Sequence, residues 1–280
     1  MTTRLNRVPV PALFAVSAIF HYLGPACASL LFGQLGVAGV AWLRIASAAA
    51  VFAIWRRPWR LLVDLDSSGR RTLLALGAVL AGMNTVFYLA VQRLPLSTVG
   101  AVEFLGTVVL AAVGVRSWRN GLALLLAIGG VAVLTDIRIV DEWLGFVFAF
   151  VNCALFMVYV TLGHRVANTG EGAVDRLGAA MLVAAVIATP HGIGDAAVSF
   201  AQPVLLLAGI GVGVCSSVVP YVIDQVTMAR VRRTTFALML SLLPAAATVI
   251  GLVVLHQLPT AADLAGVSLV ILGVALHRTT

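Results

Sequence analysis

The chain has 280 residues, of which 61% are hydrophobic and 10% are charged, and its formal net charge is +7. This composition excludes a soluble enzyme or soluble binding domain, because too few charged residues remain to cover a surface that faces water. It indicates a chain whose apolar side chains face lipid.

Ten apolar segments follow one another along the chain. Most are runs of roughly 17 to 24 residues, long enough to cross a hydrocarbon core of about 30 Å as a helix. The predicted spans are Val10–Leu31, Gly36–Trp55, Thr72–Val91, Leu96–Val115, Gly121–Thr135, Glu142–Leu162, Leu177–Gly192, Pro203–Ile223, Thr234–Leu255 and Ala261–Leu276. The segments between them are too short to hold a soluble domain. We therefore expect an all-α, polytopic membrane protein with ten transmembrane helices.

The basic residues predict the orientation of these helices. All eighteen are arginines, and if the N terminus is cytoplasmic, fifteen of them fall in cytoplasmic segments. Arg93 and Arg138 then fall outside, and Arg44 lies within a span. Since cytoplasmic loops are rich in arginine and lysine, we expect both termini to be cytoplasmic. The net charge is thus an orientation signal, and no basic face predicts a nucleic-acid partner.

Two stretches of the chain resemble each other at a nearly fixed offset. Residues 90–100 align with residues 227–237, so that Arg93 meets Arg230 at an offset of 137. Further along, Gly130 aligns with Gly273 at an offset of 143. An odd number of helices per repeat inverts the second copy in the membrane. We predict two inverted five-helix repeats, residues 1–137 and 138–280, which together form one membrane domain.

Several segments resemble the drug/metabolite transporter superfamily in its EamA family, and within it the RhtA-like inner-membrane exporters of threonine and homoserine. The segments that carry the resemblance are Gly39–Ala46, Arg57–Leu61, Tyr88–Leu96, Ala101–Gly106, Pro220–Tyr221 with Asp224, and Arg233–Phe236. Two positions depart from the family pattern, since Thr107 stands where proline is usual and Ser29 where a basic residue can occur. The resemblance implies export of a small metabolite from the cytoplasm of a bacterium by exchange for protons.

Polar residues within the predicted spans are the candidates for the transport site, because a charged side chain at the bilayer centre costs about 2.5–3.5 kcal/mol unless it is paired or faces a cavity. Counted from the helix ends, Arg44 and Glu103 lie at a similar depth and could meet. We hypothesise that Glu103 receives an ammonium group or a proton, and that Arg44 pairs with it or receives a carboxylate. The alternative is a structural ion pair between two helices. The remaining candidates for substrate contact, each of which could instead bond a neighbouring helix, are Asn84, Tyr88, His21 and Asn152.

A second group of candidates lies near the end of the eighth span. Pro220 would release a backbone carbonyl in that helix and favour a kink beside Tyr221. Asp224 falls near the predicted cytoplasmic end, where it is either a solvated interfacial carboxylate or a group that acts in gating or proton release. The kink is either a static packing feature or a hinge.

Other function classes have weaker support in the sequence. The string Gly192-Ile-Gly-Asp195 matches that of intramembrane aspartyl proteases, but such an enzyme needs a second carboxylate at the same depth. A membrane scaffold or channel has no need of an inverted repeat. No ATP-binding motif or metal-ligand spacing is present, so we expect a transporter and not an enzyme, with no cofactor and no bound metal. Its partners would be a small-molecule substrate, protons and membrane lipids, and a homodimer stays open.

Overall fold

The computed structural model describes residues 8–112, 118–135, 139–168, 172–232, 236, 239–240 and 243–276. The regular elements in these residues are helical. In chain order they are α2 (Val10–Ser29), α3 (Phe32–Arg56), α4 (Trp59–Asp64), α5 (Ser67–Val91), α6 (Leu96–Ala112), α7 (Trp118–Thr135), α8 (Ile139–Ala167), α9 (Ala173–Ala201), α10 (Pro203–Gly213), the π-helical turn η1 (Val214–Val218), α11 (Val219–Met228), α13 (Leu243–Leu255) and α14 (Ala261–Leu276).

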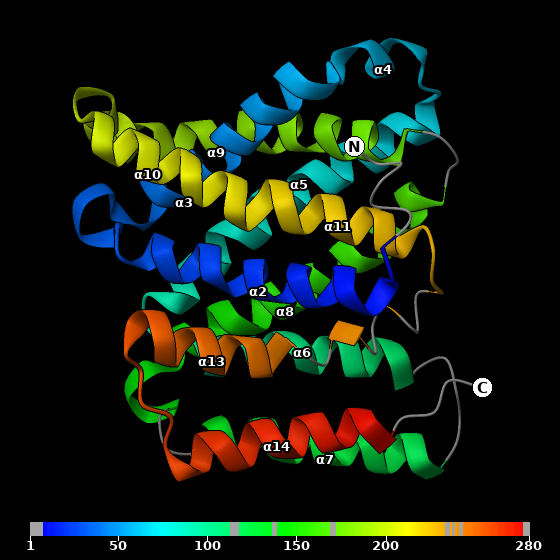
Figure 1. Ribbon diagram of the computed structural model, residues 1–280, viewed down its shortest axis with the longest axis vertical. Helices are drawn as coiled ribbons and strands as arrows, with labels where there is room; N and C mark the ends of the chain where they lie inside the picture. Colours follow the sequence, from blue (N-terminus) through cyan, green and yellow to red (C-terminus); the bar gives the residue numbers. More distant parts are fainter. Residues whose placement is uncertain are drawn as a thin grey trace.

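The long helices run side by side in one bundle (Figure 1). Within the described residues, six helices are long and apolar enough to cross a membrane, counting α10, η1 and α11 as one, and α13 and α14 contain shorter apolar stretches. The prediction of an all-α membrane protein is confirmed. The start of α2, the end of α11 and the end of α14 lie at the same end of the bundle, which we call the terminal end.

Close contacts between small residues hold the longest helices together. Helix α3 packs along α9, and α7 packs along α14. A Cβ atom on Gly39 would lie 2.9 Å from the backbone nitrogen of Ala196, and one on Gly192 would collide with Trp42. Glycine at these positions therefore lets the two backbones approach, as is common between membrane helices. At the terminal end Arg56 and Asp175 add a salt bridge of 2.6 Å between α3 and α9.

The predicted spans differ from the helices mainly at their ends. Helix α9 continues to Ala201, nine residues beyond the predicted end at Gly192, with Pro190 inside it. A proline within a membrane helix need not end it, because neighbouring helices can satisfy the backbone groups that it frees. Asp195 therefore lies within a helix, and its side chain is exposed. Val115, Thr234 and the predicted repeat boundary at residues 137 and 138 lie outside the described residues.

The predicted eighth span is one rod interrupted by a π turn. Helix α10 passes into η1 and then into α11, so the span ends at Met228 and not at the predicted Ile223. A π turn holds one residue more than the α-helical turn it replaces, and such turns occur frequently at functional sites. Pro220 lies in the first turn of the α-helical part that follows, which begins at Val219. The predicted irregularity at Pro220 thus coincides with a real change in helix geometry.

Candidate functional site

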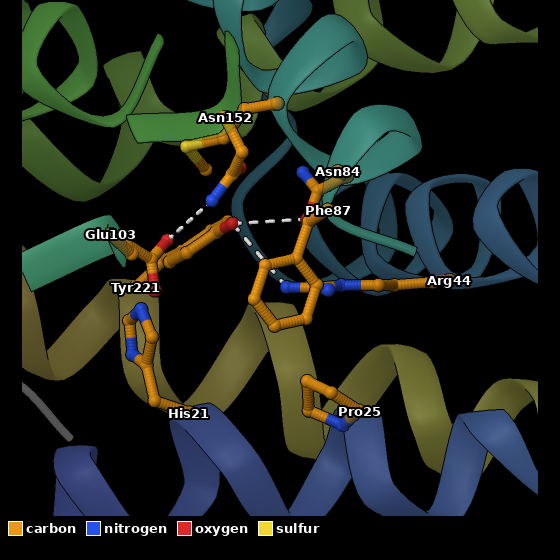
Figure 2. A pocket seen from close by; sticks show the side chains of 9 residues that line it. His21, Pro25, Arg44, Asn84, Phe87, Glu103, Asn152 and Tyr221 are labelled. Atoms are coloured by element: carbon orange, nitrogen blue, oxygen red, sulfur yellow. Dashed lines mark hydrogen bonds between the residues drawn. The ribbon is translucent and has the colours of Figure 1, made fainter. Parts of the chain in front are cut away.

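A small cavity lies among the helices of the bundle, and Figure 2 shows the side chains that line it. Six elements contribute to its lining, and the lining residues are His21, Pro25, Arg44, Met83, Asn84, Phe87, Glu103, Asn152 and Tyr221. Its volume is about 10 Å³, roughly what one water molecule needs. The side chains themselves fill the site, so the structure is a closed form with no room for an organic ligand.

Glu103, from α6, is buried to 3% exposure and is held by two neutral donors. The hydroxyl of Tyr22 on α2 donates to Oε2 at 3.1 Å. The side-chain amide of Asn152 on α8 donates to Oε1 at 3.0 Å. Each carboxyl oxygen thus has one donor from a neighbouring helix and keeps room to accept another hydrogen bond.

Arg44, from α3, is buried to 4% exposure and is bound by the interrupted helix opposite. Its Nε donates to Ser217 Oγ at 2.9 Å, and its Nη2 donates to the carbonyl of Ser216 at 3.0 Å and to Tyr221 Oη at 3.4 Å. The guanidinium also lies over the ring of Tyr88, 5.2 Å from its centroid. Its Nη1 takes part in none of these three hydrogen bonds.

The chemistry of proline explains why a carbonyl is available to Arg44. In an α-helix the carbonyl of residue 216 accepts from the backbone N–H of residue 220, four positions later. Residue 220 is a proline and has no N–H. Pro220 therefore cannot donate to the carbonyl of Ser216, which lies in the π turn and accepts from Arg44. Pro220, predicted to release a backbone carbonyl, thereby positions the guanidinium.

Arg44 and Glu103 line the same cavity without bonding each other. Within the described part of the chain no salt bridge joins them, although both belong to the lining. In Figure 2 the ring of Tyr221 lies between the two side chains. The prediction that they share one site is in accord with this geometry. The structure shows neither the predicted direct pairing of Arg44 with Glu103 nor the alternative structural ion pair between two helices, because neutral partners hold each group separately.

The other predicted substrate residues surround these two. The side-chain amide of Asn84 donates to the carbonyl of Leu80, and its oxygen accepts from Tyr221 at 3.2 Å. His21 packs edge-on against the rings of Phe156 and Tyr221. The hydroxyl of Tyr88 and the side-chain oxygen of Asn152 are buried and have no hydrogen-bond partner among the described residues. Such groups can turn to a ligand without breaking an existing bond.

Asp224 lies deeper than the sequence suggested. The interpretation as a solvated interfacial carboxylate is wrong, because its side chain is 1% exposed. Ser17 on α2 donates to Oδ1 at 2.6 Å, and Tyr159 on α8 donates to Oδ2 at 3.4 Å. Counting helix ends could not reveal this burial, since it depends on which helices lie alongside α11.

Sequence reasoning missed four partners of the charged groups, namely Ser17, Tyr22, Tyr159 and Ser217. The tyrosines carried a usable signal. Tyrosine in a membrane protein concentrates at the lipid–water interface, yet all four tyrosines of this chain fall inside predicted spans. Each is at most 1% exposed in the structure. Among the described residues no group of three or more histidine, cysteine, aspartate or glutamate side chains is placed to hold a metal ion.

Comparisons with known proteins give relatives that match over most of the chain. The threonine/homoserine exporter RhtA of Salmonella typhimurium strain SL1344 is 31% identical over 249 residues, covering 88% of this chain and 82% of the relative. The threonine/homoserine exporter RhtA of Escherichia coli K12 is 29% identical over 278 residues, covering 97% of this chain and 92% of the relative. One crystal structure shares the fold with a TM-score of 0.61 at 18% identity, over 95% of this chain and 96% of the other. No protein-family model matches.

Proposed function

Because this chain belongs to the RhtA-like family of exporters, we propose that it exports small amino acids of the threonine and homoserine type through the central cavity. Such molecules are zwitterions, with a carboxylate and an ammonium group on the same carbon. A site for them needs a cation and an anion that face one space without neutralising each other. Arg44 and Glu103 line one cavity with no salt bridge between them, and this observation carries the proposal.

Arg44 is suited to the carboxylate. Three acceptors on the η1 and α11 segment fix the guanidinium, so little side-chain freedom is lost when a ligand binds. Its Nη1 can form a charge-assisted hydrogen bond, which is roughly twice as strong as a neutral one. The hydroxyl of Tyr88 lies nearby without a partner and is suited to the same carboxylate or to a substrate hydroxyl.

Glu103 is suited to the ammonium group and, in the empty transporter, to the coupling proton. A carboxylate buried with only neutral donors is poorly compensated, because hydrogen bonds replace only part of the hydration that it loses. Either the substrate ammonium or a proton removes the charge. Since the two compete for one group, export of substrate is linked to inward movement of a proton. Asn152, Asn84 and His21 complete the wall that orients the substrate.

We place the site at the interface of two inverted five-helix repeats. In this arrangement α2, α3, α5, α6 and α7 correspond to α8, α9, the α10–α11 rod, α13 and α14. The helix contacts support it, because they occur in matching pairs. Helix α5 packs on α8 as the α10–α11 rod packs on α2, and α6 packs on α8 as α13 packs on α2. The α3–α9 and α7–α14 pairs join equivalent helices, as a twofold axis requires.

A hydrogen bond near the proposed axis supports the same alignment. Tyr221 and Asn84, which bond at 3.2 Å, are 137 positions apart, the offset at which Arg93 aligns with Arg230. Gly77 packs on the carbonyl of Ala180 as Gly213 packs on that of Arg44, but these glycines are 136 positions apart (213 minus 77). The one extra residue falls between Gly213 and Tyr221, where the π turn lies. The π turn thus accounts for the shift in alignment between the two rods.

Two such repeats can pack in two nearly equivalent ways, one open to each side of the membrane. The arginine asymmetry supports an orientation with the terminal end in the cytoplasm. The small cavity of this structure corresponds to an intermediate state between these two open forms. We propose alternating access, in which the substrate enters from the terminal end, is enclosed, and leaves at the opposite end.

Inverted membrane vesicles test the proposal, because export then fills the lumen. We expect threonine and homoserine to accumulate when the lumen is more acidic than the bath, since protons leave as substrate enters. Collapsing the gradient should stop accumulation but allow exchange of labelled for unlabelled substrate. Arg44→Ala is the matched control, and it should accumulate much less substrate at the same concentration because its affinity is lower. Accumulation that ignores the pH gradient would contradict proton exchange, and no flux of any zwitterionic amino acid would contradict the proposed substrate class.

A further inference from the structure

The rod formed by α10, η1 and α11 ends in a segment that is buried on all sides. Every residue of α11 from Pro220 to Met228 is buried, although this segment reaches the terminal end of the bundle. Helix α2 covers it on one side, and α8 and α9 cover it on others. Three of its buried residues are polar, namely Asp224, Gln225 and Thr227.

The polar residues form a stripe that begins in the central cavity. Residues three or four positions apart share one face of a helix, so Tyr221, Asp224 and Gln225 follow one another along α11. The opposite face is apolar, because Ile223 and Val226 pack with Leu13 of α2. A polar stripe therefore runs from the cavity towards the terminal end, between α11 and the helices that cover it.

Hydrogen bonds close this stripe on two sides. Asp224 accepts from Ser17 on α2 at 2.6 Å and from Tyr159 on α8 at 3.4 Å. One carboxyl group thus joins three helices directly beneath the cavity. The rings of Tyr159 and Tyr221 also lie together, with centroids 5.4 Å apart. In this structure nothing can pass along α11 to reach the cavity without separating these contacts.

Beyond Asp224, α11 carries further buried polar groups without partners, with Gln225 on the stripe and Thr227 turned away from it. Among the described residues, neither Nε2 nor Oε1 of Gln225 has a hydrogen-bond partner, and neither has the hydroxyl of Thr227. Gly163 of α8 lies against Gln225, where a Cβ would be 3.3 Å from Nε2. Buried polar groups in native proteins are nearly always satisfied, so a cluster of exceptions needs an explanation. Hydration in another conformation of the same protein supplies one.

The segment before α11 allows it to move as a unit. The π turn and Pro220 interrupt the backbone ladder, and Arg44 donates to the carbonyl of Ser216. Arg44 is also the group proposed to bind the substrate carboxylate. A ligand that binds the guanidinium therefore also changes the contact between Arg44 and the carbonyl of Ser216, at the interruption in the rod.

We propose that α11 is the gate at the terminal end of the bundle, and that its polar stripe lines the route by which a zwitterionic substrate reaches the central cavity when the gate is open. The hinge is the η1–Pro220 segment, and the latch is the contact of Asp224 with Ser17 and Tyr159. Water satisfies Gln225 in the open form. The inference rests on the proposed function only for the identity of the substrate.

Thiol labelling in membrane vesicles tests the gate without reference to any substrate. Cys27, Cys153 and Cys215 are replaced by alanine, and Gln225→Cys is introduced as the probe. Val226→Cys is the matched control on the apolar face, and Thr3→Cys reports which face of the vesicle carries the N terminus. We expect a charged, membrane-impermeant thiol reagent to modify the Gln225→Cys protein from the face that carries the N terminus, while Val226→Cys stays protected.

Weakening the latch should open the gate more often. Ser17→Ala removes one buried hydrogen bond, so we expect labelling at position 225 to become about fivefold faster. Ser199→Ala is the control, because Ser199 is buried and bonds only within its own helix, to the carbonyl of Ala196. Met228→Cys provides a second probe if Gln225→Cys protein is not produced, because Met228 and Gln225 face the same residue of α8, Gly163.

Three results would overturn the gate. They are protection of both probes in every variant, equal labelling of Gln225→Cys and Val226→Cys, and labelling only from the face opposite the N terminus. Equal labelling would mean that α11 unwinds instead of moving. If labelling follows the expected pattern but no amino acid is transported, the gate stands and the proposed substrate class fails.

Discussion

Two buried carboxylates, Glu103 and Asp224, have almost the same support and very different surroundings. Each accepts one hydrogen bond from α2 and one from α8, and in each case one donor is a tyrosine. The two levels are five residues apart on α2, or about 7 Å along the helix. Glu103 opens on a cavity that also contains Arg44, whereas Asp224 does not line that cavity.

This difference indicates what each carboxylate can do. Glu103 faces an unpaired cation across an enclosed space, so a ligand with both charges can replace the contacts that the pocket lacks. Asp224 is placed among hydroxyl donors from two other helices, so its contacts fasten helices together. A buried carboxylate is thus assigned to binding or to gating by what faces it, and not by its burial alone.

The largest effect should come from removing the cation that distinguishes the central pocket. Arg44→Ala takes away the proposed carboxylate partner, and losing one partner of a buried charged contact costs about 2–5 kcal/mol. We expect the affinity for threonine to fall by at least about 30-fold, measured as the half-saturating concentration for exchange in vesicles. The affinity of the Arg44→Lys protein should lie between those of wild type and Arg44→Ala, because an ammonium group cannot reach Ser216, Ser217 and Tyr221 together. Wild-type affinity in the Arg44→Ala protein would show that the substrate binds elsewhere.

Neutralising each carboxylate in turn should separate their roles. Glu103→Gln keeps the shape of the side chain but cannot carry a proton, so the pH gradient should no longer drive accumulation. Affinity should fall by about tenfold, since hydrogen bonds to charged groups contribute about 1.5–3 kcal/mol. Asp224→Asn should still respond to the gradient and should change the rate of transport instead. The proposed division of roles would be wrong if Asp224→Asn abolished accumulation driven by the pH gradient and Glu103→Gln changed only the rate.

The two tyrosine donors offer a finer version of the same test. Tyr22→Phe removes the hydroxyl that donates to Glu103, and Tyr159→Phe removes the one that donates to Asp224. A neutral buried hydrogen bond contributes about 1 kcal/mol, so each change should alter one equilibrium by about fivefold. We expect Tyr22→Phe to weaken substrate binding and Tyr159→Phe to speed thiol labelling at position 225. Weaker binding from both, with unchanged labelling, would place both tyrosines in the binding site.

The smallest effect should come from restoring the missing backbone donor. Pro220→Ala supplies an N–H that competes with Arg44 for the carbonyl of Ser216. Because Arg44 keeps its bonds to Ser217 and Tyr221, we expect the turnover rate to change by no more than about threefold. Initial rates at saturating substrate measure this. Complete loss of transport in a protein of normal thermal stability would contradict this. It would mean that transport depends on the missing N–H at residue 220 itself, and not on the hydrogen bond from Arg44 to the carbonyl of Ser216.

Much of the central layer follows from the sequence, because lipid makes polar residues conspicuous. Arg44, Glu103, Asn84 and Asn152 are costly in a hydrophobic span. Counting along each helix puts the first three at similar depths and Asn152 nearer the midplane. The structure brings all four to one cavity. What the count lacks is the direction around each helix, so it could not show that Arg44 turns to the broken rod and not to Glu103.

Other features depend on partners that no local pattern reveals. Asp224 looked interfacial because it lies near the end of a span, and only the positions of α2 and α8 bury it. Pro220 predicted a freed carbonyl, but not the arginine that binds it. The π turn at Val214–Val218 is also unmarked in the sequence, because no residue type in it signals the extra residue.

A cycle of ligand and protein changes tests most directly whether the central cavity holds a zwitterion between Arg44 and Glu103. Inhibition of threonine exchange is measured for threonine and for its analogues that lack the carboxylate or the ammonium group, in wild-type, Arg44→Ala and Glu103→Gln vesicles. If each charged group of the ligand binds its own residue, removing that ligand group and its residue together lowers the affinity no more than removing either one alone. The account predicts that the Arg44→Ala protein binds threonine and the analogue without a carboxylate equally well, but still prefers threonine to the analogue without an ammonium group. The Glu103→Gln protein should bind threonine and the analogue without an ammonium group equally well, but still prefer threonine to the analogue without a carboxylate. Full discrimination against both analogues in both variants would contradict it.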